Sequence, residues 1–97
     1  MTIAATNTVT VHVIPGQYEV VGTLLQTMVN TLRQSTGCLS YAALQSHFEP
    51  GLWIVTAHWD SAHDMETHFH SAAQEKYAEL LNCTLIRSIE FHSQSMA

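Results

Sequence analysis

The order in which strand-like and helix-like periodicities follow one another restricts the fold of this chain more than any other feature. Four segments alternate apolar and polar residues and are rich in β-branched side chains, which predicts four strands. These strands are expected over residues 7–14, 38–46, 52–59 and 84–92. Residues 17–35 repeat apolar side chains every three or four positions, which predicts an amphipathic helix. A second helical region, capped by Asp60 or Ser61 and continued over residues 74–81, lies between the last two strands.

This order, strand, helix, strand, strand, helix, strand, predicts an α+β fold of the ferredoxin-like βαββαβ type. In that arrangement a four-stranded antiparallel sheet carries its helices on one face. The chain has 97 residues, which is enough for one domain and too few for two hydrophobic cores. We therefore expect a single domain over residues 1–97, in which residues 1–6 and 93–97 are flexible termini.

The third predicted strand is apolar on both faces. One face carries Leu52 and Ile54, and the other carries Trp53, Val55, Ala57 and Trp59. One layer of helices covers only one face of a sheet, so the second apolar face needs another cover. A second copy of the chain would provide it across a symmetric interface, and we therefore expect a homodimer. In the alternative, a monomer, these few apolar side chains are simply exposed.

The charge balance argues against two classes of partner. Three Lys+Arg against eight Asp+Glu give a formal charge of −5. A chain with this negative charge gains little free energy from counterion release on DNA or RNA, and it is not attracted to anionic lipid. We therefore expect neither nucleic acid nor membrane as a partner. No stretch approaches the ~18 uninterrupted apolar residues of a membrane span, and the N-terminal segment lacks the features of a secretory signal. The sequence thus predicts a cytoplasmic protein.

The two cysteines, Cys38 and Cys83, are isolated and have no CxxC spacing. We expect both to be reduced, partly buried thiols and expect no thiolate zinc site. A disulfide between them is the less favoured alternative.

Two segments of the chain resemble one protein family. Residues 36–41 read Thr-Gly-Cys-Leu-Ser-Tyr, and Trp59 is followed nine residues later by His68 and then by Ser71. In this order, and on this framework of strands and helices, they resemble the antibiotic biosynthesis monooxygenase superfamily. The resemblance implies a dimeric α+β barrel. It also implies an oxygenase without metal, flavin or heme, which deprotonates an electron-rich phenol or hydroquinone so that the anion gives an electron to O₂.

The chain departs from this family at several positions. Relatives similar to the aromatic-polyketide monooxygenases place Asn four residues before the Trp and Tyr six residues after it, where this chain has Val55 and Met65. Many relatives carry Glu where this chain has Ala57. The heme-degrading branch resembles the chain at Asn7, but its heme-binding His falls at Ala78. Heme ligation by that route is therefore disfavoured, and no cofactor is expected.

His68 is the candidate base for this chemistry, and Trp59 is the candidate positioning group. An unperturbed imidazole titrates near neutrality, and His68 lies on or beside the helix face that should meet the sheet. The indole of Trp59 can donate a hydrogen bond and stack on an aromatic ligand. The other substrate-binding candidates are Asn7, Tyr41, Met65, Val55 and Phe69. Both main candidates also have a structural interpretation, Trp59 as a core anchor and His68 as a histidine bonded to a backbone carbonyl.

The remaining histidines indicate two further hypotheses. His63, Glu66 and His70 share one helix face, which allows a facial metal site, but the HExxH spacing is missing. A solvated helix face is the simpler interpretation, and no metal is expected. Three other histidines fall on predicted strands and would form a pH-sensitive patch if the sheet gathered them. They are His12, His58 and His92.

Taken together, these residues favour a cofactor-independent monooxygenase that acts on a small aromatic or quinol substrate. Two alternatives stay open. One is a non-catalytic dimer that binds a small ligand, and the other is an isomerase or lyase whose histidine moves protons without O₂. The sequence decides neither whether the chain is an enzyme nor which substrate it takes.

Overall fold

The computed structural model describes residues 3–49 and 51–95, and its elements follow the order that the sequence predicts. In this part of the chain the elements are β1 (Ala5–Val13), α1 (Tyr18–Leu32), β2 (Cys38–Gln45), β3 (Leu52–Trp59), α2 (Ala62–Phe69), α3 (Ala72–Leu81) and β4 (Ile86–Ser95). The strands form one antiparallel sheet in the order β2-β3-β1-β4. The ferredoxin-like α+β fold is thus confirmed.

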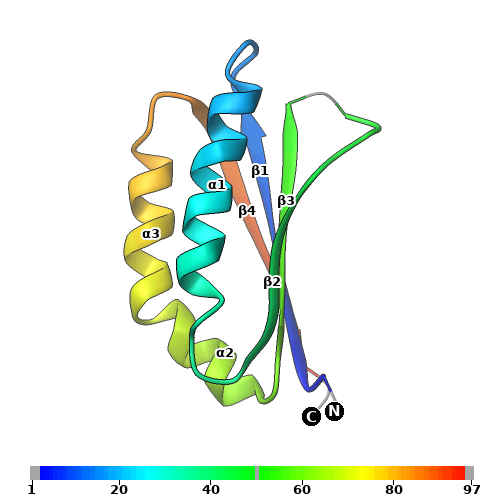
Figure 1. Cartoon of the computed structure of the whole chain (residues 1–97), viewed down its shortest axis with the longest axis vertical. Helices are drawn as coiled ribbons and strands as arrows, with labels where there is room; N and C mark the ends of the chain where they lie inside the picture. The colour runs from blue at the N-terminus through cyan, green and yellow to red at the C-terminus, as the bar shows by residue number, and fades with distance from the viewer. Residues whose placement is uncertain (1–2, 50, 96–97) are drawn as a thin grey trace.

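The helices form a single layer on one face of the sheet (Figure 1). Helices α1 and α3 run side by side along the strands, and α2 lies near one end of the sheet, before α3. A site between the helices and the sheet is therefore bounded by α2 and α3 on one side and by the strands on the other.

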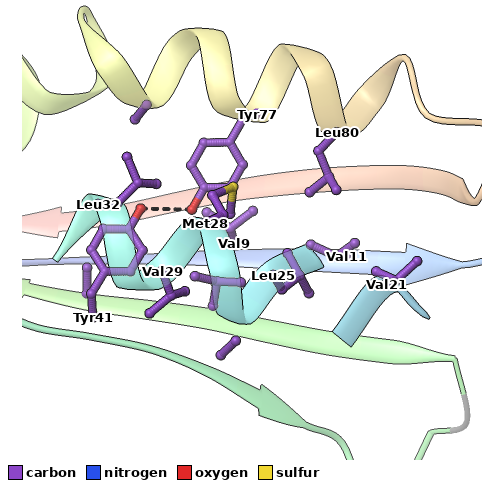
Figure 2. Close-up of a cluster of buried hydrophobic side chains, with 14 of the residues drawn as sticks. Val9, Val11, Val21, Leu25, Met28, Val29, Leu32, Tyr41, Tyr77 and Leu80 are labelled. Atoms are coloured by element: carbon purple, nitrogen blue, oxygen red, sulfur yellow. Dashed lines mark hydrogen bonds between the residues drawn. The ribbon is translucent and has the colours of Figure 1, made fainter. Parts of the chain in front are cut away.

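The sheet face toward the helices carries the hydrophobic core. Strand β1 buries every second residue, namely Ala5, Asn7, Val9, Val11 and Val13. Val9 lies between Val55 of β3 and Phe91 of β4. Helix α1 packs its apolar stripe on this face, as Figure 2 shows for Val21, Leu25, Met28, Val29 and Leu32. Leu24 also belongs to the apolar stripe of α1 but is 43% exposed, because it lies at the edge of the stripe, in a groove between α1 and α3.

The opposite face of the sheet, which we call the outer face, is not covered by a helix in the described residues. It carries the polar residues of β1 that alternate with the core, namely Thr6, Thr8, Thr10 and His12. Leu52 and Ile54 of β3 lie on this face, and Leu44 of β2, which is 57% exposed, pairs with Ile54. The two-sided apolar character predicted for β3 is therefore present in the structure.

All three strand histidines lie on the outer face, but they do not form one cluster. The Nε2 atoms of His12 and His92 lie 3.9 Å and 4.0 Å from the carboxylate oxygens of Glu90. His58 is hydrogen-bonded instead to Thr6, with 2.9 Å between Nδ1 and Oγ1. The sheet thus gathers two of the three histidines around a carboxylate.

Parts of both ranges that the sequence assigned to flexible termini lie in strands of the sheet. Strand β1 already begins at Ala5, and β4 continues to Ser95, so both strands extend into the ranges 1–6 and 93–97. Ala5 pairs with Ser95, because the antiparallel ladder between β1 and β4 continues to the ends of both strands. Residues 1–2 and 96–97 lie outside the described residues.

Two smaller expectations concern the membrane and the cysteines. Within residues 3–49 and 51–95, no helix combines the length and the apolar character needed to cross a membrane.

Cys38 and Cys83 are both free thiols of intermediate exposure, as expected. Burial raises the pKa of the Cys38 thiol.

Candidate functional site

His68 is a buried side chain on α2, and the start of this helix determines its position. The Oγ atom of Ser61 accepts a hydrogen bond from the backbone N–H of Asp64 at 3.0 Å, so Ser61 is the N-cap. Two turns later His68 is only 3% exposed, and its ring centroid lies 4.7 Å from that of Trp59. The structure therefore brings together the two residues that the sequence singled out.

Both ring nitrogens of His68 are hydrogen-bonded to hydroxyl groups, not to a backbone carbonyl. Nδ1 lies 3.0 Å from Oγ of Ser35, and Nε2 lies 3.1 Å from the hydroxyl of Tyr41. That hydroxyl lies 2.8 Å from the hydroxyl of Tyr77. Figure 2 shows the rings of Tyr41, from β2, and Tyr77, from α3, pointing toward one another with their hydroxyls joined. We call Ser35, His68, Tyr41 and Tyr77 the tyrosine–histidine network.

Ser35 reaches His68 because α1 ends earlier than the periodicity predicts. The helix stops at Leu32, three residues before the predicted end, and the backbone N–H of Ser35 bonds to the carbonyl of Leu32 in the turn that follows. This turn places the Ser35 hydroxyl against α2. Ser35 is partly exposed, whereas the other three members of the network are buried.

Burial shifts the pKa values of His68, Tyr41 and Tyr77 in the directions that favour their neutral forms. Desolvation lowers the pKa of His68 to about 4, so the imidazole is unprotonated near pH 7. Desolvation raises the pKa of Tyr77 to about 12, and burial together with Tyr77 raises the pKa of Tyr41 further still. The sequence predicts an imidazole that titrates near neutrality, and the structure differs because no anionic group among the described residues offsets the burial of His68.

A second buried polar pair lies beside the network. The indole N–H of Trp59 donates to Oδ1 of Asn7 at 2.7 Å. Asn7 is 1% exposed, and its Nδ2 atom is buried with no hydrogen-bond partner among the described residues. Buried polar groups are usually paired, so an orphan donor of this kind is typical of a position that meets a ligand or a water molecule.

Two adjoining hollows of about 290 and 270 Å³ open between the helices and β4, and we call them together the aromatic groove. They share Phe69 and Phe91. The first also contains Met65 and Ser93, and the second also contains Tyr77. The ring of Tyr77 lies 5.3 Å from Phe91, edge-on, and 6.2 Å from Phe69, stacked. These three rings form an aromatic wall next to the tyrosine–histidine network.

The predicted substrate-binding residues lie in different places relative to this groove. Met65 and Phe69 line it. Asn7 pairs in the sheet with Ser93, which lines the groove, and Tyr41 belongs to the network. Val55 is fully buried and lies in the core instead, because the inner sheet face surrounds it.

Three residues of the site were not singled out from the sequence, namely Ser35, Tyr77 and Phe91. Tyr77 and Phe91 fall on apolar positions of a helix and a strand, which gives them the same pattern as ordinary core residues. Ser35 falls at the end of a helix, and nothing in the sequence signals its contact with His68.

The hypothesis of a metal site finds no support in the described residues. His63, Glu66 and His70 are exposed. No group of three or more His, Cys, Asp or Glu within residues 3–49 and 51–95 is arranged to hold a metal ion.

Comparison with known proteins gives a family match and several likenesses of fold. Residues 4–80 match the model of a family described as antibiotic biosynthesis monooxygenase. A comparison with curated proteins gave no match.

Solved structures of similar fold come from several bacteria. A candidate antibiotic biosynthesis monooxygenase from Deinococcus radiodurans is 20% identical, with a TM-score of 0.83 over 96% of this chain and 92% of that chain. The protein PA3566 from Pseudomonas aeruginosa is 20% identical, with a TM-score of 0.77 over 100% of this chain and 97% of that chain. The protein Rv0793 from Mycobacterium tuberculosis is 18% identical, with a TM-score of 0.77 over 96% of this chain and 94% of that chain. At such identities these likenesses show the fold alone.

Proposed function

The chain belongs to the antibiotic biosynthesis monooxygenase family, and on this premise we propose that it oxidises a small electron-rich aromatic substrate with O₂. The substrate is a phenol or hydroquinone that supplies the electrons itself, so the proposed reaction needs no cofactor. The observation that carries the proposal is the buried, neutral tyrosine–histidine network beside the aromatic groove.

The aromatic groove suits a small planar substrate. Its larger hollow, of about 290 Å³, is near the lower end of the roughly 300–1,000 Å³ that small-molecule sites occupy. The rings of Phe69, Tyr77 and Phe91 offer faces and edges on which an aromatic ring packs favourably. A second hydroxyl or carbonyl on the substrate is compatible with the polar residues Ser93 and Glu66 in the groove lining.

The proposed reaction has four steps. Loss of the phenolic proton gives a phenolate, which transfers one electron to O₂ and leaves a substrate radical and superoxide. These two species recombine through a new C–O bond, and the resulting peroxide anion takes up a proton and loses water. A phenol and one O₂ thus give a quinone and one water. The apolar lining of the second hollow favours this course, because it offers the radical pair few polar partners.

In the first step His68 serves as a transient proton acceptor. Its pKa of about 4 lies roughly six units below that of an ordinary phenol, so full transfer of the proton to its ring costs about 8 kcal/mol. Enzymes that turn over about 1 to 1,000 times per second have barriers of roughly 13–17 kcal/mol. The protonated ring is therefore accessible during turnover, but it does not accumulate.

Asn7 is the proposed donor to the negative charge that develops on oxygen. Its Nδ2 atom is a buried donor without a partner among the described residues, and the bond from Trp59 to Oδ1 fixes the orientation of the amide. A fixed, buried donor stabilises a developing anion without the cost of reorganisation.

We also propose that the chain forms a homodimer through the outer face of the sheet. The apolar strip of Leu44, Leu52 and Ile54 lies on this face, and Leu44 is largely exposed. A second copy of the chain would bury this strip and seal the side of the sheet that the helices do not cover.

Oxygen uptake tests the proposed reaction. Purified protein is incubated with a panel of phenols, hydroquinones and anthrones, with and without O₂. We expect consumption of one O₂ per product and a fall of at least about tenfold in His68→Gln, given the usual contribution of a proton-transfer group. His63→Gln, on an exposed site of the same helix, is the matched control and should keep the full rate.

Other outcomes would point to the alternatives. Conversion that persists without O₂ would contradict the monooxygenase and favour an isomerase or lyase. A panel compound that raises the melting temperature without being converted would favour a ligand-binding dimer, because a ligand that prefers the folded state stabilises it.

A further inference from the structure

The tyrosine–histidine network carries an inference that rests on the proposed function and deepens it. We propose that the network is a proton path between the aromatic groove and solvent, with Tyr77 at its inner end and Ser35 at its outer end. Tyr77 is then the catalytic residue that exchanges a proton with the substrate. Tyr41 and Ser35 are positioning residues, which act through His68.

The hydrogen bonds of the network favour one direction. The hydroxyl of Tyr41 has one proton and two neighbours, the hydroxyl of Tyr77 at 2.8 Å and Nε2 of His68 at 3.1 Å. When Tyr41 donates to His68, Tyr77 donates to Tyr41, and the Nδ1–H of the neutral His68 donates to Ser35. The protons of Tyr77, Tyr41 and His68 then each have an acceptor, and the last acceptor is Ser35, which is partly exposed. In the reverse arrangement the proton of Tyr77 has no acceptor among the described residues.

The two ends of the network lie in different surroundings. Tyr77 is only 3% exposed, and its ring lines the aromatic groove with Phe69 and Phe91. Ser35 is partly exposed and lies in the turn after α1, where its hydroxyl can exchange a proton with water. The path therefore connects an apolar site to solvent through groups that all stay neutral near pH 7.

A path of this kind fits the proton balance of the proposed reaction. In the first step the substrate O–H bond breaks and its proton passes to the oxygen of Tyr77. The proton of Tyr77 passes to Tyr41, the proton of Tyr41 to Nε2 of His68, and the Nδ1 proton of His68 to Ser35. Ser35 then releases one proton to water. The peroxide anion formed later requires one proton. Its uptake runs the same transfers inward and restores every member of the network to its starting state. No net proton is gained or lost.

Nitrogen-15 NMR of the histidine side chains tests the starting state without any substrate. We expect His68 to carry its proton on Nδ1, to have an unprotonated Nε2, and to stay neutral down to about pH 5. Tyr41→Phe should shift the Nε2 resonance, because it removes the donor to that atom. Tyr18→Phe is the matched control, since its hydroxyl donates to the carbonyl of Leu52, outside the network. A proton on Nε2, or a protonated ring at pH 7, would overturn the path whatever the turnover.

Kinetics test the two ends. With a panel substrate that the wild type oxidises, Tyr77→Phe should lower kcat at least about tenfold and change KM less than about twofold. Ser35→Ala should lower kcat and increase the solvent deuterium isotope effect, and Ser35→Thr should restore both, because it keeps a hydroxyl. Ser40→Ala, on the exposed side of β2, should change neither.

The two proposals fail in distinguishable ways. If the wild type oxidises no compound of the panel, the proposed function fails, and the NMR measurement alone decides on the path. If the wild type is active and a folded Tyr77→Phe keeps its full rate, the path is overturned and the oxygenase stands. Melting temperatures near that of the wild type show that each variant is folded.

Discussion

The indole N–H of Trp59 donates to Oδ1 of Asn7 across 2.7 Å, joining two residues that are 52 positions apart in the chain. This bond decides which end of the Asn7 amide stays unpaired, because Oδ1 is occupied and Nδ2 is not. An unpaired buried donor costs about 1–3 kcal/mol. The folded protein thus keeps a destabilising unpaired donor at Asn7, where the proposed reaction needs a hydrogen-bond donor to the developing anion.

The Asn7–Trp59 bond should appear as a coupling in stability. Trp59→Phe leaves Oδ1 unpaired, so we expect it to lose about 1–3 kcal/mol of unfolding free energy. Asn7→Leu leaves the indole N–H unpaired but also removes the unpaired Nδ2, so we expect a smaller loss. The double variant removes both partners and should lose about 1 kcal/mol less than the sum of the two. Urea denaturation of the four proteins measures this cycle. Strictly additive losses would show that the two side chains do not stabilise one another.

Acid should destabilise the fold through His68. Its pKa is about 4 in the folded protein and about 6.5 in an unfolded chain, so the folded state binds fewer protons between these values. The contribution of His68 to the unfolding free energy is close to zero at pH 7. It becomes increasingly unfavourable as the pH decreases from about 6.5 to about 4, and it is constant below pH 4. The full loss is about 3 kcal/mol.

The measurement is the unfolding free energy in urea from pH 7 to pH 4, compared between the wild type and His68→Gln. Groups that titrate in both proteins cancel in the difference, so the loss assigned to His68 should disappear in the variant. His58→Gln, on the outer face, should retain it. Parallel pH profiles of wild type and His68→Gln would contradict the prediction.

Gly22 should resist replacement although it lies inside a helix. Ala is ordinarily favoured over Gly in a helix by about 1 kcal/mol, but a Cβ at Gly22 would collide with the six-membered ring of Trp53. We expect Gly22→Ala to destabilise the protein by about 1–2 kcal/mol, because overpacking outweighs the gain in propensity. The combination with Trp53→Leu should recover part of the loss in a urea titration. A Gly22→Ala protein more stable than the wild type would refute the close contact.

The proposed dimer depends on the apolar strip of the outer face. Leu44→Glu places a charge in that strip, so we expect a concentration-dependent shift from dimer to monomer in light scattering coupled to size-exclusion chromatography. Phe48→Glu is the matched control, because Phe48 is 99% exposed and lies outside the strands. A wild type that elutes as a monomer at all concentrations would exclude the dimer.

Much of the fold could be predicted because each element carries its own pattern. Strand β3 has the predicted limits, Leu52 to Trp59, since alternation and the turn before it both mark them. The family resemblance of residues 36–41 and of the Trp59–His68 spacing is confirmed by the family match. The end of α1 was predicted three residues too far, because periodicity does not register the competing turn at Ser35.

The candidate site was only partly predictable, as Tyr77 and Val55 illustrate. Both occupy apolar positions in periodic segments, yet Tyr77 joins the network and Val55 lies in the core. A pattern along the chain reports which face of an element is buried, and it does not report which side chain of another element lies opposite.

By itself, the sequence determined the order of the elements, the inner face of each and the family, because these follow from local periodicity and short motifs. Only the tertiary structure decided that Ser35 and Tyr41 meet at His68 and that Tyr77 meets Tyr41, since these contacts span 27 to 36 positions and depend on how α1, α2, α3 and β2 pack. It also decided the charge state of the imidazole, because a pKa depends on the water and the polar groups that the folded chain removes or supplies.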